Sequence, residues 1–134
     1  MKSSRLMIVA AVLVFAAAAA YPADKPTRVQ KSEARLAELL KGRTAGEPVS
    51  CIPEFQSSRV EVLEGVAMVY GLGKVVYVAK PEPPDSMQWD DIIVVKRNAG
   101  MLCNTDIVRT VDRMSGFTTG VVFLSKFVPY TKAD

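Results

Sequence analysis

Two cysteines and a complete lack of histidine limit the chemistry that this chain can perform. Its 134 residues include Cys51 and Cys103, 17 lysines and arginines, 14 aspartates and glutamates, and no histidine. A Ser-His-Asp triad, a Cys-His nucleophile pair and a histidine general base are therefore excluded. Two cysteines cannot complete a tetrahedral zinc site alone, so neither a metal nor another cofactor is expected.

Three aspartates are the remaining candidates for catalysis. Paired carboxylates can act as general acid and base or bind a hard cation, which directs attention to Asp90, Asp91 and Asp106. In the alternative interpretation, Asp90 and Asp91 form a turn before a strand, Asp106 bonds to nearby backbone amides, and no residue is catalytic. A hydrolase without histidine would need two of these carboxylates in one pocket.

A proline-rich segment is the predicted binding region. Residues 81–89 read Pro-Glu-Pro-Pro-Asp-Ser-Met-Gln-Trp. Prolines reduce the entropy that a loop loses on binding, and an exposed tryptophan offers a large contact area. Pro83, Pro84 and Trp89 are therefore expected to contact a ligand or partner. The alternative for Trp89 is that it folds over the end of the sheet.

The first 20 residues have the pattern of a secretory signal peptide. Lys2 and Arg5 form a short basic region, residues 6–20 are apolar, and the segment ends in five alanines. As a helix this apolar stretch would rise about 22 Å, less than the ~30 Å hydrocarbon core of a bilayer. The sequence thus predicts a periplasmic or secreted protein with no stable membrane insertion after signal cleavage.

The charge of the mature chain gives no indication of nucleic-acid binding. Lys2 and Arg5 belong to the signal peptide, so 15 of the 17 basic residues remain against 14 acidic ones, and the net charge is +1. Binding to a phosphate backbone needs a dense basic face, whereas the basic and acidic residues of this chain are interleaved. A partner protein of the envelope, or a hydrolase, is expected instead.

In an oxidising compartment the two cysteines are expected to form a disulfide. An even number of cysteines in a secreted chain usually means a bridge. Cys51 and Cys103 are 52 positions apart, and closing a loop of this length stabilises a fold by roughly 4 kcal/mol. Redox chemistry is the alternative, but the chain contains neither a Cys-x-x-Cys motif nor a histidine that could activate a thiol.

The predicted fold is mainly β with one N-terminal helix. A tether over residues 21–27 precedes a helix over 28–42, whose leucines are expected to lie on the protein's own sheet. Residues 46–134 form the predicted β domain, a small antiparallel barrel or curled sheet of about six strands. The strand patterns lie near residues 59–64, 66–70, 75–79, 92–95, 107–111 and 117–124.

Two further segments have structural interpretations. Gly71-Leu72-Gly73 lies between two predicted strands and is too short for a phosphate-binding loop, so it indicates a hairpin turn. Phe127-Val128-Pro129-Tyr130 lies near the C-terminus and is expected to pack back onto the core.

Several short motifs follow one another in a defined order over about residues 45–131. They are Gly46-x-Pro48-x-Ser50-Cys51-Ile52, Gly65-x-Ala67-x-x-Tyr70, Tyr77-Val78, Leu102-Cys103-x-x-Asp106-Ile107, Ser115-Gly116, Gly120 and Phe127-Val128-Pro129-Tyr130. In this order and spacing the chain resembles a family of small secreted alphaproteobacterial proteins of unknown function. The resemblance implies secretion and a shared fold, and it implies no catalytic residue.

The chain departs from that family in its cysteines. Members of the family often carry one further cysteine in the loop after the third strand and another two residues beyond the equivalent of Gly120. Here the loop reads Pro84-Asp85-Ser86-Met87, and the second position is Val122. The joint absence implies that those two cysteines pair with each other in the family, which leaves Cys51 to pair with Cys103.

These observations together predict a non-enzymatic secreted or periplasmic protein that binds a ligand or is associated with the envelope. One alternative is an inhibitor of a periplasmic hydrolase such as a protease or lysozyme, because small rigid secreted domains suit that task. The other is a hydrolase without histidine that uses aspartate carboxylates. Fold class alone does not distinguish these functions.

Overall fold

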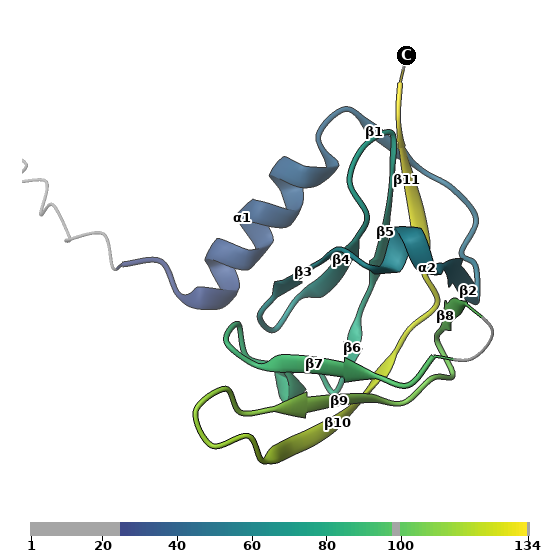
Figure 1. Ribbon diagram of the computed structural model, residues 1–134. Coiled ribbons are helices and arrows are strands. Elements are labelled where there is room, and N and C mark those ends of the chain that lie inside the picture. Colours follow the sequence, from purple (N-terminus) through teal and green to yellow (C-terminus); the bar gives the residue numbers. More distant parts are fainter. Residues whose placement is uncertain (1–24, 98–99, 134) are drawn as a thin grey trace, which may run out of the picture.

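The computed structural model describes residues 25–97 and 100–133. In this part of the chain, eleven strands form three antiparallel sheets beside one long helix, which confirms a mainly β fold (Figure 1). The helices are α1 (Arg28–Leu40), the short α2 (Glu54–Ser57) and the 3-10 turn η1 (Pro84–Ser86). The strands are β1 (Arg43–Ala45), β2 (Cys51–Pro53), β3 (Val60–Leu63), β4 (Ala67–Tyr70), β5 (Val75–Ala79), β6 (Pro81–Glu82), β7 (Ile92–Val95), β8 (Met101–Cys103), β9 (Val108–Val111), β10 (Thr118–Leu124) and β11 (Val128–Lys132).

Helix α1 lies on the protein's own sheet, as predicted, and the structure shows that it begins at a capping box. The Thr27 hydroxyl accepts from the Gln30 N–H at 3.2 Å, and the Gln30 side chain accepts from the Thr27 N–H at 2.8 Å. This exchange satisfies donors that the first turn of a helix leaves free. The helix ends at Leu40 rather than 42, because Gly42 adopts a φ of +72°. The leucines that pack on the sheet are Leu36, Leu39 and Leu40.

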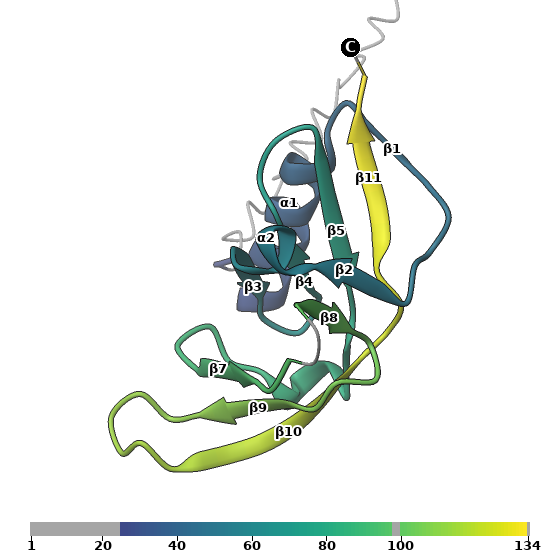
Figure 2. The same cartoon turned by 45° about the vertical axis from the view of Figure 1, so that its right-hand side comes forward.

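The five-stranded sheet, in the order β1-β11-β5-β4-β3, is covered on both faces. Helix α1 covers one face, and the two smaller sheets lie beyond the other (Figures 1 and 2). All four residues of β4 are buried, with Ala67 and Val69 in the cluster under the helix and Met68 and Tyr70 in the opposite one. The hairpin predicted at Gly71-Leu72-Gly73 joins β4 to β5.

One bent pair of strands belongs to both larger sheets. β5 pairs with β11 in the five-stranded sheet, and their continuations β6 and β10 pair in the four-stranded sheet (Figure 2). Leu124 lies opposite Pro81 and Val128 lies opposite Val78, so three residues on one strand face two on the other. This extra residue is a β-bulge, which bends a strand and increases its twist. This bent pair, formed by β5–β6 and β10–β11, therefore joins the two sheets, and we name it the ribbon.

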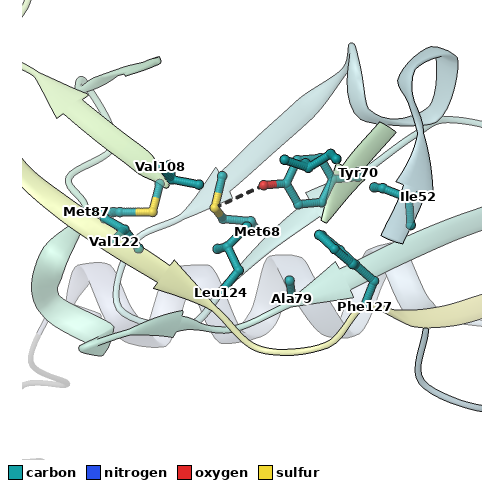
Figure 3. Packing of buried hydrophobic residues seen from close by; sticks show 10 residues of the cluster. Ile52, Met68, Tyr70, Ala79, Met87, Val108, Val122, Leu124 and Phe127 are labelled. Carbon is teal, nitrogen blue, oxygen red and sulfur yellow. Dashed lines mark hydrogen bonds between the residues drawn. The ribbon is translucent and has the colours of Figure 1, made fainter. Parts of the chain in front are cut away.

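A phenylalanine fills the inside of this bend. Phe127 is fully buried, and its backbone exchanges two hydrogen bonds with Val49, at 2.8 and 2.9 Å. Its ring meets the Tyr70 ring edge-on, with 5.6 Å between the centroids (Figure 3). At the bulge itself, the Ser125 hydroxyl accepts the Lys80 N–H at 2.9 Å. The expectation that the C-terminal motif packs onto the core is confirmed.

The four-stranded sheet, in the order β6-β10-β9-β7, has one buried and one exposed face. The inward side chains of β9 and β10 are buried, namely Val108, Thr110, Val122 and Leu124. The outward face surrounds Arg109 and carries the exposed side chains Ile92, Val94, Val121 and Phe123. In the part of the chain that the structure describes, no further layer covers this outward face.

The two-stranded sheet contains the disulfide that the cysteine count predicts. Cys51 lies directly opposite Cys103 in the β2–β8 pair, and their sulfurs are bonded. The next pair, Ile52 and Leu102, is fully buried in the core between the sheets. Each strand has only three residues, so the covalent bond and this buried pair hold the small sheet in place.

The described strands form no closed barrel, and the count of six strands is not confirmed. The six predicted patterns correspond to β3, β4, β5, β7, β9 and β10, and the structure adds five strands of two to five residues. β3 and β7, the outer strands of the two larger sheets, do not pair with each other among the described residues. The result is a curled arrangement that is joined at the ribbon and open at β3 and β7.

The predicted signal peptide, residues 1–20, lies outside the described residues, as does most of the predicted tether over 21–27. The β domain predicted over 46–134 starts slightly earlier, because β1 begins at Arg43. Within the described ranges, every helix is too short or too polar to cross a bilayer.

Replacement of Phe127 by Ala is expected to lower the free energy of unfolding by about 3–5 kcal/mol, because a cavity opens where the ribbon bends. The matched control is Phe117→Ala, since Phe117 is 75% exposed and its loss should cost less than about 1 kcal/mol. Urea denaturation of the oxidised protein measures both values. Equal losses in the two variants would show that the bend does not depend on Phe127.

Candidate functional site

Trp89 is an exposed residue in the turn before β7. Its side chain is 62% exposed, and the Arg28 guanidinium carbon lies 5.7 Å from the centre of its ring. Trp89 and Arg28 line a hollow of about 350 Å³ at the start of α1. The interpretation that Trp89 covers the end of the sheet is therefore wrong, and Met87 fills the core there instead. The reason is a turn closed by the Asp91 N–H and the Gln88 carbonyl, which leaves Trp89 at its corner.

Neither Pro83 nor Pro84 lines the hollow beside Trp89. Both prolines are exposed, and Pro84 begins the turn η1, in which the Ser86 N–H donates to the Pro83 carbonyl at 3.1 Å. Pro84 lines a separate hollow of about 480 Å³ beside Leu36 of α1. Pro84 and Trp89, predicted as parts of one binding region, therefore border different hollows, and the two prolines stiffen the chain before Trp89.

The turn between β9 and β10 presents two exposed apolar side chains. Met114 is 93% exposed and Phe117 is 75% exposed. An Asp112 carboxylate oxygen accepts from the N–H groups of Met114 and Ser115, at 3.2 and 2.7 Å, and from the Ser115 hydroxyl at 2.7 Å. Asp112 also donates its N–H to the Phe117 carbonyl and accepts the Gly116 N–H, both at 2.9 Å. The strand patterns predicted near residues 107–111 and 117–124 border this turn, but the exposure of its apolar side chains was not predicted, although large apolar residues beside the turn residue Gly116 were a usable signal.

These two loops lie side by side at one end of the molecule. The Arg113 side chain donates to the Asp90 carbonyl at 3.4 Å, which connects the β9–β10 turn to the segment before β7. The first of these loops lies at the start of α1, where the Arg28 guanidinium lies over the Trp89 ring. We name residues 84–91 and 112–117 the loop end. Its exposed large apolar side chains are Trp89, Met114 and Phe117.

The three candidate aspartates do not meet in one place. Asp106 accepts the Cys103 N–H at 2.8 Å in the turn after β8, and Asp91 accepts the Gln88 N–H at 2.9 Å. These bonds are the turn roles that the sequence suggested as the alternative to catalysis. Asp90 and Asp91 share a polar hollow of about 310 Å³ at the loop end with further acidic and hydroxyl side chains, including Asp85, Asp112, Thr110 and Thr119.

The chemistry available in this polar hollow is that of an acidic surface. Hydrogen bonds from the Ser115 hydroxyl and amide lower the pKa of Asp112, so this carboxylate is ionised at neutral pH. One of its two carboxylate oxygens already accepts the hydrogen bonds from Met114 and Ser115 within the turn. Among the described residues, no three cysteine, aspartate or glutamate side chains are grouped to hold a metal ion. The hollow can therefore accept hydrogen bonds and attract basic groups of a partner.

Comparison with known proteins gives no functional assignment. No protein family, no curated protein and no solved structure matches the chain. The function is therefore inferred from the loop end itself, in which the fold holds apolar and acidic groups side by side.

Asp112→Ala is expected to loosen the β9–β10 turn while leaving the core folded. Hydrogen exchange of the Met114 and Ser115 amides should accelerate at least tenfold, because both amides lose their acceptor. Asp85→Ala is the control, since Asp85 lines the same hollow and is exposed. In the unmodified protein the same amides should be protected at neutral pH and lose protection as the pH falls through the lowered pKa of Asp112. Unchanged exchange in Asp112→Ala would mean that the backbone alone holds the turn.

Proposed function

We propose that the protein is a non-enzymatic secreted domain, periplasmic or envelope-associated, that binds a partner protein through its loop end. One observation carries this proposal: Trp89, Met114 and Phe117 are exposed on two loops that a hydrogen bond connects. Single exposed apolar residues are ordinary on any surface, whereas several large ones on adjacent structured loops are typical of a binding site.

The physical advantage of this arrangement is a small loss of entropy on binding. Asp112 orders the turn that carries Met114, and the turn closed by Asp91 orders the segment that carries Trp89. Groups that are already ordered in the free protein lose less conformational freedom when they are buried. Tryptophan is moreover the residue type most enriched among side chains that dominate binding energy.

The acidic hollow adds a preference for charge. Asp85, Asp90 and Asp91 line this hollow, and they belong to the same loop as Trp89. A partner with apolar pockets and basic residues around them would complement this surface. Charge complementarity of this kind mainly increases the association rate and excludes partners of the wrong sign.

The proposed location rests on three observations of different kinds. Residues 1–20 have the pattern of a signal peptide, and the motifs over about residues 45–131 resemble a secreted alphaproteobacterial family. The Cys51–Cys103 disulfide is of the kind that persists in an oxidising compartment.

Loss of the loop-end side chains should abolish capture of the partner without unfolding the domain. Immobilised oxidised protein is incubated with envelope extract, and bound proteins are compared between the unmodified domain, Trp89→Ala and Met114→Ala. Each variant should lose at least tenfold in captured partner, since central apolar anchors contribute about 2 kcal/mol or more. The control is Leu72→Ala, because Leu72 is also exposed, at 67%, but lies in the β4–β5 turn. Equal loss in all three variants, or none in any, would contradict the loop end as the binding surface.

Inhibition of a secreted hydrolase is a second candidate, favoured by Met114. This residue is at the tip of a hairpin that Asp112 holds in one shape. A convex, ordered loop with one projecting apolar side chain fits the concave pocket of a protease or lysozyme.

A panel of proteases and lysozymes tests this second candidate. Micromolar protein is expected to inhibit one of them, and Met114→Asp should remove the inhibition, because a charge cannot enter an apolar pocket without a large desolvation cost. Thr105→Asp, in the exposed turn before β9, is the matched control and should keep full inhibition. No inhibition anywhere in the panel would remove this candidate.

A further inference from the structure

The open side of the fold is a groove between two strand edges. β3 is the last strand of the five-stranded sheet and β7 the last strand of the four-stranded sheet (Figure 1). A hollow of about 390 Å³ is lined by Val60 of β3 and by Ile93, Val94 and Val95 of β7. The neighbouring hollow at the start of α1 is lined by Val62, also of β3, so the groove runs along β3. We name this groove the seam.

The direction of the backbone groups on β9 identifies which residues bond to β7. Asp112, which follows β9, donates its N–H to Phe117 on the β10 side, at 2.9 Å. In an antiparallel sheet the N–H and C=O groups of successive residues point to alternate sides. Val111 and Arg109 therefore direct their backbone groups away from β10 and toward β7.

On β7, the same alternation leaves one set of backbone groups facing the seam. Ile92 lies opposite Val111 of β9, and Val94 lies opposite Arg109, so Ile92 and Val94 bond to β9. Ile93 and Val95 direct their N–H and C=O groups to the other side. Among the described residues these groups have no strand partner, because β7 is the end of its sheet.

β3 has an equivalent free edge. The Arg59 carbonyl accepts the Gly71 N–H at 2.9 Å, so Arg59 faces β4 and Glu61, two residues later, does the same. Val60 and Val62 therefore direct their backbone groups away from β4. In the part of the chain that the structure describes, no strand pairs with this edge.

The floor of the seam is apolar and already well packed. Met68, Tyr70 and Leu102 line the hollow beneath the two edges. Burial raises the pKa of Tyr70, so its hydroxyl is neutral, and it donates to the Met68 sulfur at 3.4 Å (Figure 3). A chain lying in the seam would meet apolar side chains below it and free backbone donors and acceptors beside it.

Basic residues are in excess at one end of the seam. At the end where β3 begins, Arg97 is paired with Glu54, and Arg59 makes no salt bridge with any described residue. At the other end Arg28 is paired with Glu64, and the charge of Lys31, which lines the hollow beside Trp89, is offset by Asp90 and Asp91, which precede β7. Positive charge therefore remains at the end formed by Arg59 and Arg97.

We propose that the seam binds an extended segment of a polypeptide, which adds a strand to the free edge of β7 or β3. Only an extended chain presents N–H and C=O groups at the spacing of these edges, and strand addition of this kind is an established mode of peptide recognition. The side chains of the segment that point inward are apolar, and its flank beside Arg59 and Arg97 is acidic to complement the basic end of the seam. The seam meets the loop end at Trp89, which lines the hollow at the start of α1, and the proposal rests on the strand edges rather than on the loop-end side chains.

A synthetic probe peptide tests the proposal. It has about nine residues, is acetylated and amidated, and contains alternating Val and Thr between two pairs of Asp, so that one pair reaches the basic end of the seam in either direction of binding. Binding to the oxidised domain is followed by NMR, with hydrogen exchange of single backbone amides as the readout. Before addition of the peptide, the amides of Ile93 and Val95 should exchange at least tenfold faster than those of Ile92 and Val94. Saturation with the peptide should slow the amides of Ile93 and Val95, or of Val60 and Val62, at least tenfold.

Two peptide controls separate strand addition from nonspecific binding. N-methylation of alternate amides removes the donors of one edge, and one of the two possible patterns should weaken binding at least tenfold. Replacement of the Asp pairs by Lys pairs should also weaken binding, and this difference should shrink at high salt. Equal binding of all these peptides would overturn the proposal, as would no binding of the Asp-flanked peptide at millimolar concentration.

A matched pair of variants tests the seam from the protein side. Ile93→Pro removes an amide that faces the seam and leaves the β7–β9 bonds intact, as proline is tolerated where an edge N–H faces outward. Ile93→Ala removes the same side chain and keeps the amide. Proline should weaken peptide binding at least tenfold more than alanine, and equal effects would overturn the proposal. If the proline variant does not fold, the N-methylated peptides test the same bonds. Protection of Ile93 and Val95 that increases with protein concentration, without peptide, would assign the seam to a second copy of the chain instead.

Discussion

The bulge in the ribbon of β5–β6 and β10–β11 is the constraint on which the rest of the structure depends. Residues 125–127 lie opposite two residues only, so the ribbon bends there and Phe127 leaves the ladder to bond with Val49. The bend brings the Phe127 ring onto Tyr70. Val49 leads directly into β2, so the same bend also positions the disulfide-linked sheet. A straight ribbon would continue as one flat sheet and could not enclose a core from both sides.

The open side of the fold is a consequence of this joint. The ribbon connects the two larger sheets along one side, so closure would require pairing of β3 with β7 on the other. β7 has four residues and lies between Asp90-Asp91 and Lys96-Arg97. Short length and flanking charges are devices by which proteins keep an edge strand from pairing indiscriminately. An edge of this kind stays available and accepts only a strand whose own flanks carry complementary charge.

Local signals in the sequence predicted the local parts of this fold. The repeat of leucines predicted α1 without help from distant residues, and the structure adds the capping box of Thr27 and Gln30 at its start. β2 and β8 were not predicted, because three-residue strands held by a distant disulfide have no local pattern. β11 was missed because Pro129 argues against a central strand. The Pro129 carbonyl accepts the Gly46 N–H, so the Pro129 nitrogen points to the same side of β11. Because β1 ends at Ala45, no strand needs a hydrogen bond from that nitrogen, and a proline is tolerated there.

The binding surfaces were harder to predict, because exposure depends on the turns. Met87 and Trp89 are both large and apolar, and only the turn at Gln88 and Asp91 decides that Met87 is buried and Trp89 is not. Met114 and Phe117 break the rule that turns are polar, and such local violations are expected where a surface serves a function. The loop end and the seam meet at β7, which starts beside Trp89 and bonds to one neighbour only. An edge strand such as β7, with half of its backbone groups free, loses fewer hydrogen bonds when it moves than a strand inside a sheet. Both surfaces therefore border the strand whose displacement costs the least free energy.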